Sequence, residues 1–243
     1  MIINRIKTIR IKNVLKLEYY NHYKVYKQAE RYFEEINDAA SNLLVNYPYY
    51  TFAVQFLISK FERALRMGNE AELYAEQEEL FADFEPDPNN VPQHIIYTVY
   101  RAMCCYYLGR YEETAKLLNS LINDVSFKKY PQAQMEIKAL LCLQYCLLKD
   151  IDLYNQLSNS VQRNIRMIGK DTCENVLTFL KILKIAVSEA KKEKQKKISA
   201  LIPKFKSISV NYFAPTSFIR MDEKFVERLI ALEIQGAGAN ADD

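Results

Sequence analysis

"YYLGRYEETAKLLNSL" runs from Tyr106 to Leu121 and is typical of a helix, a tight turn and a second helix. The turn is expected at Gly109, because glycine adopts without steric cost the left-handed conformation that ends a helix. Beyond it, apolar side chains recur at helical spacing through Leu118 and Leu121. Whether this hairpin stands alone or is one unit of an array decides the fold.

Similar turns recur along the chain at nearly regular intervals. Lys24 and Lys149 align with Gly109, and Gly68 gives a looser fourth match, so the steps between turns are 44, 41 and 40 residues. A period in this range indicates stacked helical repeats. Nine residues after the three aligned turns stand Phe33, Leu118 and Ser158, and twelve residues after them stand Ile36, Leu121 and Val161. In the looser unit around Gly68, Leu73 and Leu80 are expected to face inward.

Two of these hairpins resemble the tetratricopeptide repeat (TPR) family in a divergent form. The resemblance rests on Ala102, Gly109, Tyr111 and Leu118 around one turn and on Tyr20, Tyr26, Ala29 and Phe33 around another. It departs from the family in its longer steps, in Arg101 where leucine is usual and in Thr114 where a small alanine is usual. The resemblance implies an all-α fold, a right-handed α–α superhelix of about four to five hairpins.

The repeats are expected to fill residues 1–168, and the region after Gly169 is less regular. Residues 169–235 are predicted to form a degenerate hairpin and a C-terminal capping helix, continuous with the solenoid, and residues 236–243 a disordered tail. The hairpin would contain an amphipathic helix from Cys173 to about Ala190 and a basic helix broken near Pro203. The last helix would be capped by Thr216 or Ser217. Its apolar stripe would consist of Phe218, Phe225, Leu229 and Leu232.

The charges of the 243-residue chain are unevenly distributed around a net charge of +3. Eight acidic residues and no basic ones lie between Glu70 and Asp87, whereas nine lysines lie between Lys181 and Lys206. Such runs usually form solvated helix faces, and the basic run also suits nucleic acid or an anionic surface. No secretory signal or membrane span is recognisable, and five cysteines without a signal predict a cytoplasmic chain with reduced thiols.

Motifs for catalysis or cofactor binding are missing from the sequence. The internal glycines do not cluster into a phosphate-binding loop, and neither HExxH nor GxSxG occurs. His22 and His94 are the two histidines, and a solvated or structural role is expected for both. Cys142 and Cys146 share a helix face, but core packing is favoured over a metal site because no CxxC loop accompanies them. We therefore expect no enzyme activity, no cofactor and no metal.

The TPR resemblance implies that the first helix of each hairpin lines a concave groove for a protein or peptide. The groove helices around residues 95–108 and 137–148 are apolar almost all round. Either the superhelix is tight enough to close over them, or another apolar element fills the groove, namely the C-terminal segment of the chain or an amphipathic helix of a partner. We predict a non-catalytic scaffold, and self-association into a homo-oligomer stays open. The predicted partner-binding residues are His22, Glu62, Arg66, Val99, Met103, Tyr106, Tyr107 and Leu143. The alternative is binding of nucleic acid or an anionic surface through Lys181–Lys206.

Overall fold

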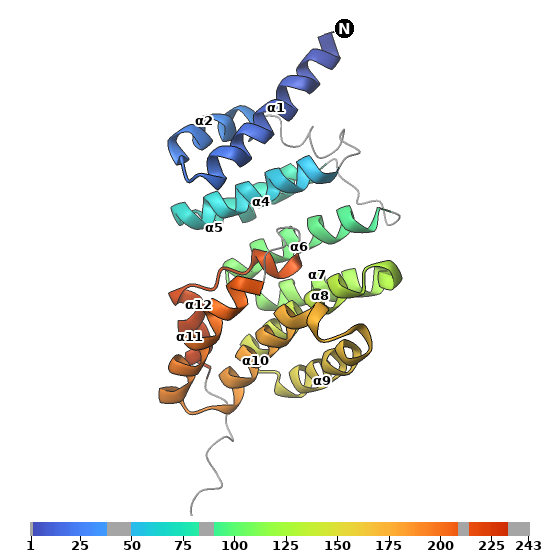
Figure 1. Cartoon of the computed structure of the whole chain (residues 1–243), viewed down its shortest axis with the longest axis vertical. Helices are drawn as coiled ribbons and strands as arrows, with labels where there is room; N and C mark the ends of the chain where they lie inside the picture. The colour runs from blue at the N-terminus through green and yellow to red at the C-terminus, as the bar shows by residue number, and fades with distance from the viewer. Residues whose placement is uncertain (1, 38–49, 83–89, 209–213, 233–243) are drawn as a thin grey trace, which may run out of the picture. The chain divides into compact units, whose positions relative to one another are not determined.

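The computed structural model describes residues 2–37, 50–82, 90–208 and 214–232, with side chains described from Lys12 and Gln55 onward in the first two segments. Within these segments the regular structure is helical and no strand occurs, which confirms the all-α prediction (Figure 1). The tail predicted at 236–243 lies outside the described residues. The chain divides into two compact units, Met1–Leu108 and Gly109–Asp243.

The first unit is built from two helical hairpins and a further helix. Within each hairpin the two helices pack together, and α1, α4 and α6 also contact one another in series, while α5 packs on α6. The helices are α1 (Ile2–His22), α2 (Tyr26–Asn37), α4 (Tyr50–Met67), α5 (Glu70–Leu80) and α6 (Val91–Tyr107).

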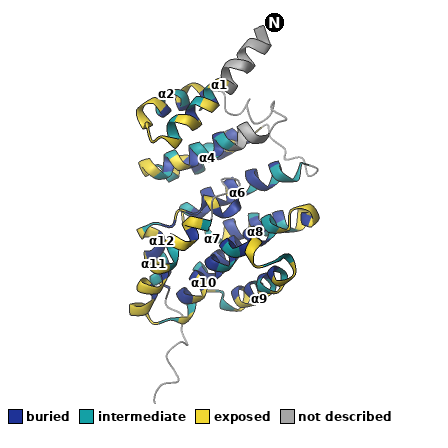
Figure 2. Cartoon of the chain, viewed as in Figure 1, coloured by how far each residue is buried: buried dark blue, intermediate teal, exposed yellow. Residues whose placement is uncertain are grey.

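Aromatic side chains form the core around α6. The ring of Phe61 on α4 lies 5.9 Å from that of Tyr100 and 5.3 Å from that of Tyr107, and Phe81 lies 5.7 Å from Tyr97. Edge-to-face pairs of this kind contribute about 0.5–1.5 kcal/mol each beyond the area they bury. The helix that the sequence marks as apolar almost all round is thus lined by aromatic residues of α4 and of the end of α5, and most of it is buried (Figure 2).

The second unit is arranged around α8. This helix contacts α7, α9, α10 and the short 3-10 helix η3, and α10 packs against α11. The elements are α7 (Tyr111–Asp124), η1 (Phe127–Lys129), α8 (Pro131–Leu147), α9 (Ile151–Ile168), η2 (Asp171–Cys173), α10 (Glu174–Ser188), α11 (Lys191–Ile208), η3 (Pro215–Phe218) and α12 (Glu223–Ile230). Gly169 is the C-cap of α9, and α10 and α11 follow it as a packed pair of helices.

The four predicted turns share one backbone geometry. Lys24, Gly68, Gly109 and Lys149 have φ values of 57°, 77°, 75° and 60°, and the next helix begins two residues after each of them. Three of the turns also contain the same backbone bond from an N–H to the carbonyl five residues earlier, which is typical of a Schellman C-cap. These bonds are Val25 N–H to Tyr20 O, Asn69 N–H to Ala64 O and Asp150 N–H to Tyr145 O, each 2.9 Å.

The second helices of the four hairpins bury the same positions. Counted from the turn residue, positions five, nine and twelve are buried in every case. Leu73 and Leu80, which were expected to face inward, are buried, and so are the aligned positions of the other three hairpins. The buried sets are Ala29, Phe33 and Ile36 in α2, Leu73, Gln77 and Leu80 in α5, Thr114, Leu118 and Leu121 in α7, and Tyr154, Ser158 and Val161 in α9.

Two local predictions near the C-terminus are wrong. Helix α11 is not broken near Pro203 but continues to Ile208, because the backbone bond that proline cannot donate falls on the exposed side of the helix. The last helix begins at Glu223 and is capped by Asp222, whose carboxylate accepts from Phe225 N–H at 3.0 Å. Thr216 instead bonds a buried carboxylate on α8.

Candidate functional site

The predicted apolar anchors lie in the interior. Val99 and Met103 on α6 and Leu143 on α8 have no exposed surface, and Tyr106 exposes 2%. Tyr107 is half-buried, with its ring against that of Phe61. That these residues contact a partner stays a prediction. Such contact would require that they first become exposed.

The predicted polar residues of the first unit are exposed, and two of them border the turn between α1 and α2. The guanidinium of Arg66 on α4 lies 4.1 Å above the ring of Tyr26, and the ring of His22 lies 4.9 Å from that of Tyr23. Desolvation raises the pKa of Glu62, and the charge of Arg66, one turn further along α4, opposes this shift. His22 and Arg66 therefore flank one surface.

That surface is a stripe of exposed apolar and aromatic side chains, which we call the tyrosine surface. It consists of Leu15 and Tyr19 on α1, of Tyr23 and Val25 in the turn that follows, and of Tyr26, the first residue of α2. Tyr19 is 58% and Tyr23 60% exposed, and their rings lie 4.7 Å apart. Leu15, Tyr19 and Tyr23 share one face because they are spaced by four residues, whereas Val14 and Leu17 point into the core.

Sequence reasoning missed the tyrosine surface, although its spacing is visible in the sequence. Tyrosine supplies apolar contact area together with a hydroxyl, and tyrosine and arginine are enriched among the residues that carry the binding energy of protein interfaces. A contiguous exposed apolar patch is also unusual on a monomer and marks interaction sites. This chemistry suits the contact face of another protein.

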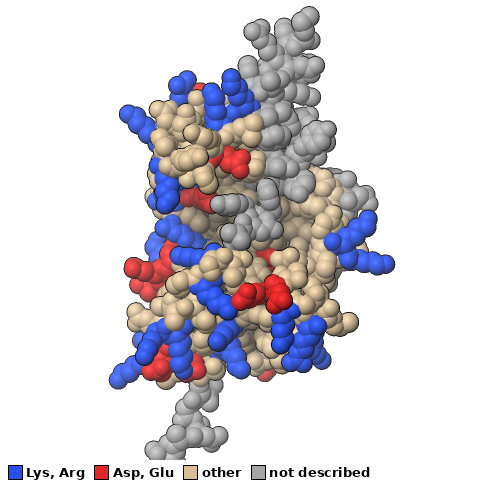
Figure 3. All heavy atoms as spheres, viewed as in Figure 1, with Lys and Arg blue, Asp and Glu red and all other residues tan. Residues whose placement is uncertain are grey.

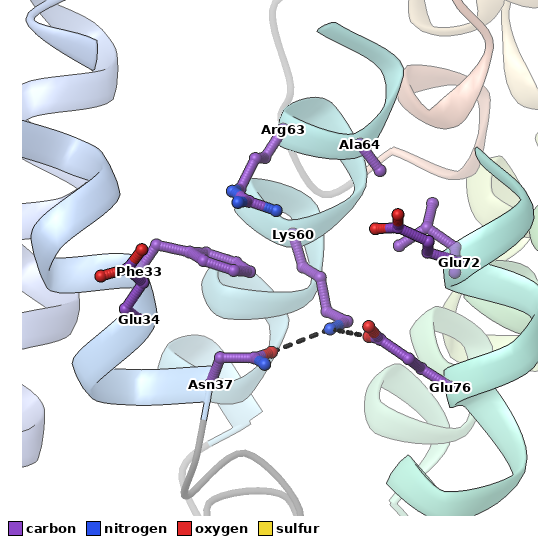
Figure 4. A pocket seen from close by; sticks show the side chains of 9 residues that line it. Phe33, Glu34, Asn37, Lys60, Arg63, Ala64, Glu72 and Glu76 are labelled. Atoms are coloured by element: carbon purple, nitrogen blue, oxygen red, sulfur yellow. Dashed lines mark hydrogen bonds and ion pairs between the residues drawn. The ribbon is translucent and has the colours of Figure 1, made fainter. Parts of the chain in front are cut away.

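A polar pocket of about 180 Å³ lies between α2, α4 and α5 (Figure 4). Lys60 is 5% exposed, and its ammonium donates to Asn37 Oδ1 at 2.8 Å and pairs with the carboxylate of Glu76. Beside it, Arg63 Nε donates to Glu30 Oε1 at 2.6 Å, and this bond raises the pKa of Arg63. Both cations of the pocket are therefore paired with carboxylates of the same chain. These ion pairs and hydrogen bonds link α4 to α2 and to α5.

The predicted basic run is partly used for internal contacts. Lys194 is buried and donates to the carbonyl of Leu232 at 2.6 Å, while Lys197 pairs with Glu189 and Lys204 with Glu174. The remaining six lysines of the run are exposed, namely Lys181, Lys184, Lys191, Lys192, Lys196 and Lys206. Figure 3 shows basic and acidic side chains interspersed over the lower part of the second unit.

The cysteines are placed as the core prediction requires. All five are buried, and desolvation raises the pKa of Cys142 to about 12 and also raises that of Cys104. A thiol with a raised pKa is a poor nucleophile at neutral pH because little thiolate forms. Across the described residues no group of three or more His, Cys, Asp and Glu side chains is arranged to hold a metal ion.

No protein-family model, curated protein or solved structure matches the chain. Among the described helices, none combines the length and the hydrophobicity needed to cross a membrane.

Proposed function

We propose that the chain is a non-catalytic, TPR-like repeat protein whose hairpins stack into a right-handed superhelix and which binds another protein. Four turns with one geometry and four second helices with one pattern of buried positions support the repeat architecture. The buried cysteines support a reducing compartment such as the cytoplasm.

The observation that carries the proposal is the tyrosine surface. It offers Tyr19 on α1 and Tyr23 in the turn directly after it, with their rings in contact and more than half exposed, and α1 itself packs on α2 and α4. A rigid helix restricts the side chains before binding, so a partner loses less conformational entropy on contact. His22 and Arg66 at its border add charge and hydrogen-bond donors that select among partners. The buried anchors on α6 and α8 favour this surface over the predicted groove as the first contact.

Co-purification from the cells that express the chain naturally tests the proposal. The variant Tyr19→Ser/Tyr23→Ser removes two exposed rings, and Tyr130→Ser is the matched control, because Tyr130 is an exposed tyrosine of the second unit. Loss of a tyrosine from a binding hot spot weakens association by about 2 kcal/mol, roughly 30-fold. We expect a partner that the wild type and Tyr130→Ser retain and the double variant loses. Equal recovery with all three proteins, or with none, would refute the proposal.

A second candidate function is binding of nucleic acid or an anionic surface through the Lys181–Lys206 region. Eight of the nine lysines of this region are exposed, which supports it, whereas the burial of Lys194 and the ion pairs of Lys197 and Lys204 count against it. Such binding would weaken steeply as salt is raised. A gel shift at low salt that disappears in Lys191→Gln/Lys192→Gln/Lys196→Gln would support this function, and the absence of any shift would exclude it.

A further inference from the structure

The C-terminal segment Ala214–Leu232, which we call the C-terminal strap, lies across two helices that begin hairpins in the second unit. Its 3-10 helix η3 packs on α8, and α12 packs on α10 and α11. The ring of Phe225 in α12 stacks 6.5 Å from that of Phe179 in α10. The strap buries the side chains of Thr216, Phe218, Ile219, Met221, Phe225, Val226, Leu229 and Leu232.

A buried carboxylate on α8 recognises the strap. Glu136 is 1% exposed, and its Oε2 accepts from the backbone N–H of Thr216 at 3.1 Å and from the Thr216 hydroxyl at 2.8 Å. Its Oε1 accepts from Asn175 Nδ2 on α10 at 3.1 Å. Two residues after Thr216, Phe218 is buried. Glu136 and Asn175, which we call the seat, therefore bind the strap through a main-chain N–H and a hydroxyl of Thr216, and a buried aromatic ring follows two positions later.

The seat coincides with the face of α8 that the TPR resemblance assigns to partner binding. Glu136 precedes Ala139 by three residues and Leu143 by seven, so the three side chains share one face of the helix. Leu143 is one of the predicted partner-binding residues. The strap thus packs on α8, one of the two helices that the sequence shows to be apolar almost all round.

Burying the carboxylate of Glu136 costs free energy that a segment held only by apolar packing would not require. A buried carboxylate loses its hydration, and an apolar pair of similar volume is often as stable or more stable in such a place. A buried polar group can instead fix which residue of a segment binds at a given place. A segment without donors at that place would leave the carboxylate unpaired in the interior.

We propose that this seat is an exchangeable docking site, occupied here by the C-terminal strap, and that a partner segment with threonine followed two positions later by phenylalanine displaces the strap. The proposal rests on the proposed function in that it assumes the chain binds proteins. It adds a second contact, on the second unit, and the chemistry of the segment that binds there.

A labelled peptide with the sequence of residues 214–232 tests the proposal against full-length protein. The full-length variant Thr216→Val/Phe218→Ala loosens the strap but leaves Glu136 and Asn175 intact, so the seat stays competent. We expect the peptide to bind this variant at least about 30-fold more tightly than the wild type, from the loss of one charge-assisted hydrogen bond and one buried ring. A peptide that carries the same two substitutions is the matched control and should not bind. Equal binding to both proteins, or binding to neither, would overturn the proposal.

Native-state hydrogen exchange of the wild type decides the question where the loosened variant does not fold. The amides of residues 214–232 should exchange through an opening at least tenfold more populated than the opening of α8. Exchange of both segments by the same global opening would refute an exchangeable strap. Neither measurement uses a cellular partner, so a failed co-purification with successful peptide binding would contradict the proposed function and leave the docking site standing.

Discussion

Glu136 on α8 and Thr216 in η3 are joined by two hydrogen bonds across 80 residues of sequence. Both side chains are buried, and Asn175 completes the coordination of the carboxylate. This contact fixes the C-terminal strap on the second unit. It also explains why the helix with the most apolar surroundings in that unit carries an acidic residue.

Replacing Glu136 should separate its structural role from its charge. Glu136→Ala leaves the Thr216 and Asn175 donors unpaired in the interior and should lower the free energy of unfolding by about 2–4 kcal/mol. Glu136→Gln keeps one acceptor oxygen, and the Asn175 amide can turn to accept from the new NH₂, so its loss should be about 1 kcal/mol. Urea denaturation followed by circular dichroism measures both. Glu112→Ala, an exposed position on α7, is the control and should change stability by less than about 0.5 kcal/mol. Equal losses of unfolding free energy for the alanine and glutamine variants would contradict this account of the hydrogen bonds at Glu136.

The same carboxylate predicts a pH dependence. Desolvation raises the pKa of Glu136 above its ordinary value, and the bonds from Thr216 and Asn175 oppose the shift only in part. The folded state therefore binds a proton at Glu136 more tightly than the unfolded state does. The contribution of this protonation to folding stability is complete below the pKa of the unfolded state and is lost as pH rises through the pKa of the folded state.

Comparison with Glu136→Gln isolates this dependence, because the variant lacks the titrating group. As the pH is lowered toward 4.5, the stability of the wild type should increase relative to that of the variant. Among the neighbouring groups, Cys173 is buried and its own pKa is raised, so it stays a thiol throughout this range. A wild type that loses stability relative to Glu136→Gln on acidification would reverse the sign and refute the assignment.

The turn residues offer a test of the repeat geometry. Lys149 adopts φ 60°, a left-handed conformation that costs a non-glycine residue about 1–2 kcal/mol. Lys149→Gly should therefore raise the free energy of unfolding by about 0.5–1 kcal/mol after the greater entropy of the unfolded glycine is counted. Lys149→Ala removes the same side chain but keeps the strain, and should be close to neutral. A glycine variant no more stable than the alanine variant would argue against the left-handed turn.

The converse substitution at Gly109 should destabilise. Its φ is 75°, and a Cβ added there meets nothing within 4 Å, so the backbone strain is the whole effect. Gly109→Ala should lower the free energy of unfolding by about 1–2 kcal/mol, and thermal denaturation of the pair measures it. No loss of stability in Gly109→Ala would contradict the turn that decides the fold.

Local features of the fold could be predicted from the sequence because they depend on neighbouring residues. Gly68 and Gly109 mark turns by their own conformational freedom, and the alignment extended the same conformation to Lys24 and Lys149. The buried positions of the second helices follow from the same alignment. Each of these features requires only that a hairpin repeat at a known spacing.

Contacts between distant segments could not be predicted in the same way. A threonine before an apolar run is a signal for a helix cap, and Thr216 carries that signal, but its hydroxyl serves Glu136 instead while Asp222 caps α12. Likewise, an apolar helix such as α6 does not reveal which of its faces its own chain covers, so Val99 and Met103 were predicted as anchors for a partner and are buried. The exposure of Tyr19 and Tyr23 depends on which face of α1 the neighbouring helices α2 and α4 cover, and the spacing of the tyrosines does not give this.

The central claim is that a partner protein contacts the tyrosine surface, and photo-crosslinking in the native cell tests it most directly. A photoreactive benzoylphenylalanine at position 23 replaces an aromatic ring that is 60% exposed, and the same residue at position 130 is the control in the second unit. We predict a light-dependent covalent adduct with another protein from position 23 and none from position 130. Adducts of equal yield from both positions, or none from position 23, would contradict the claim.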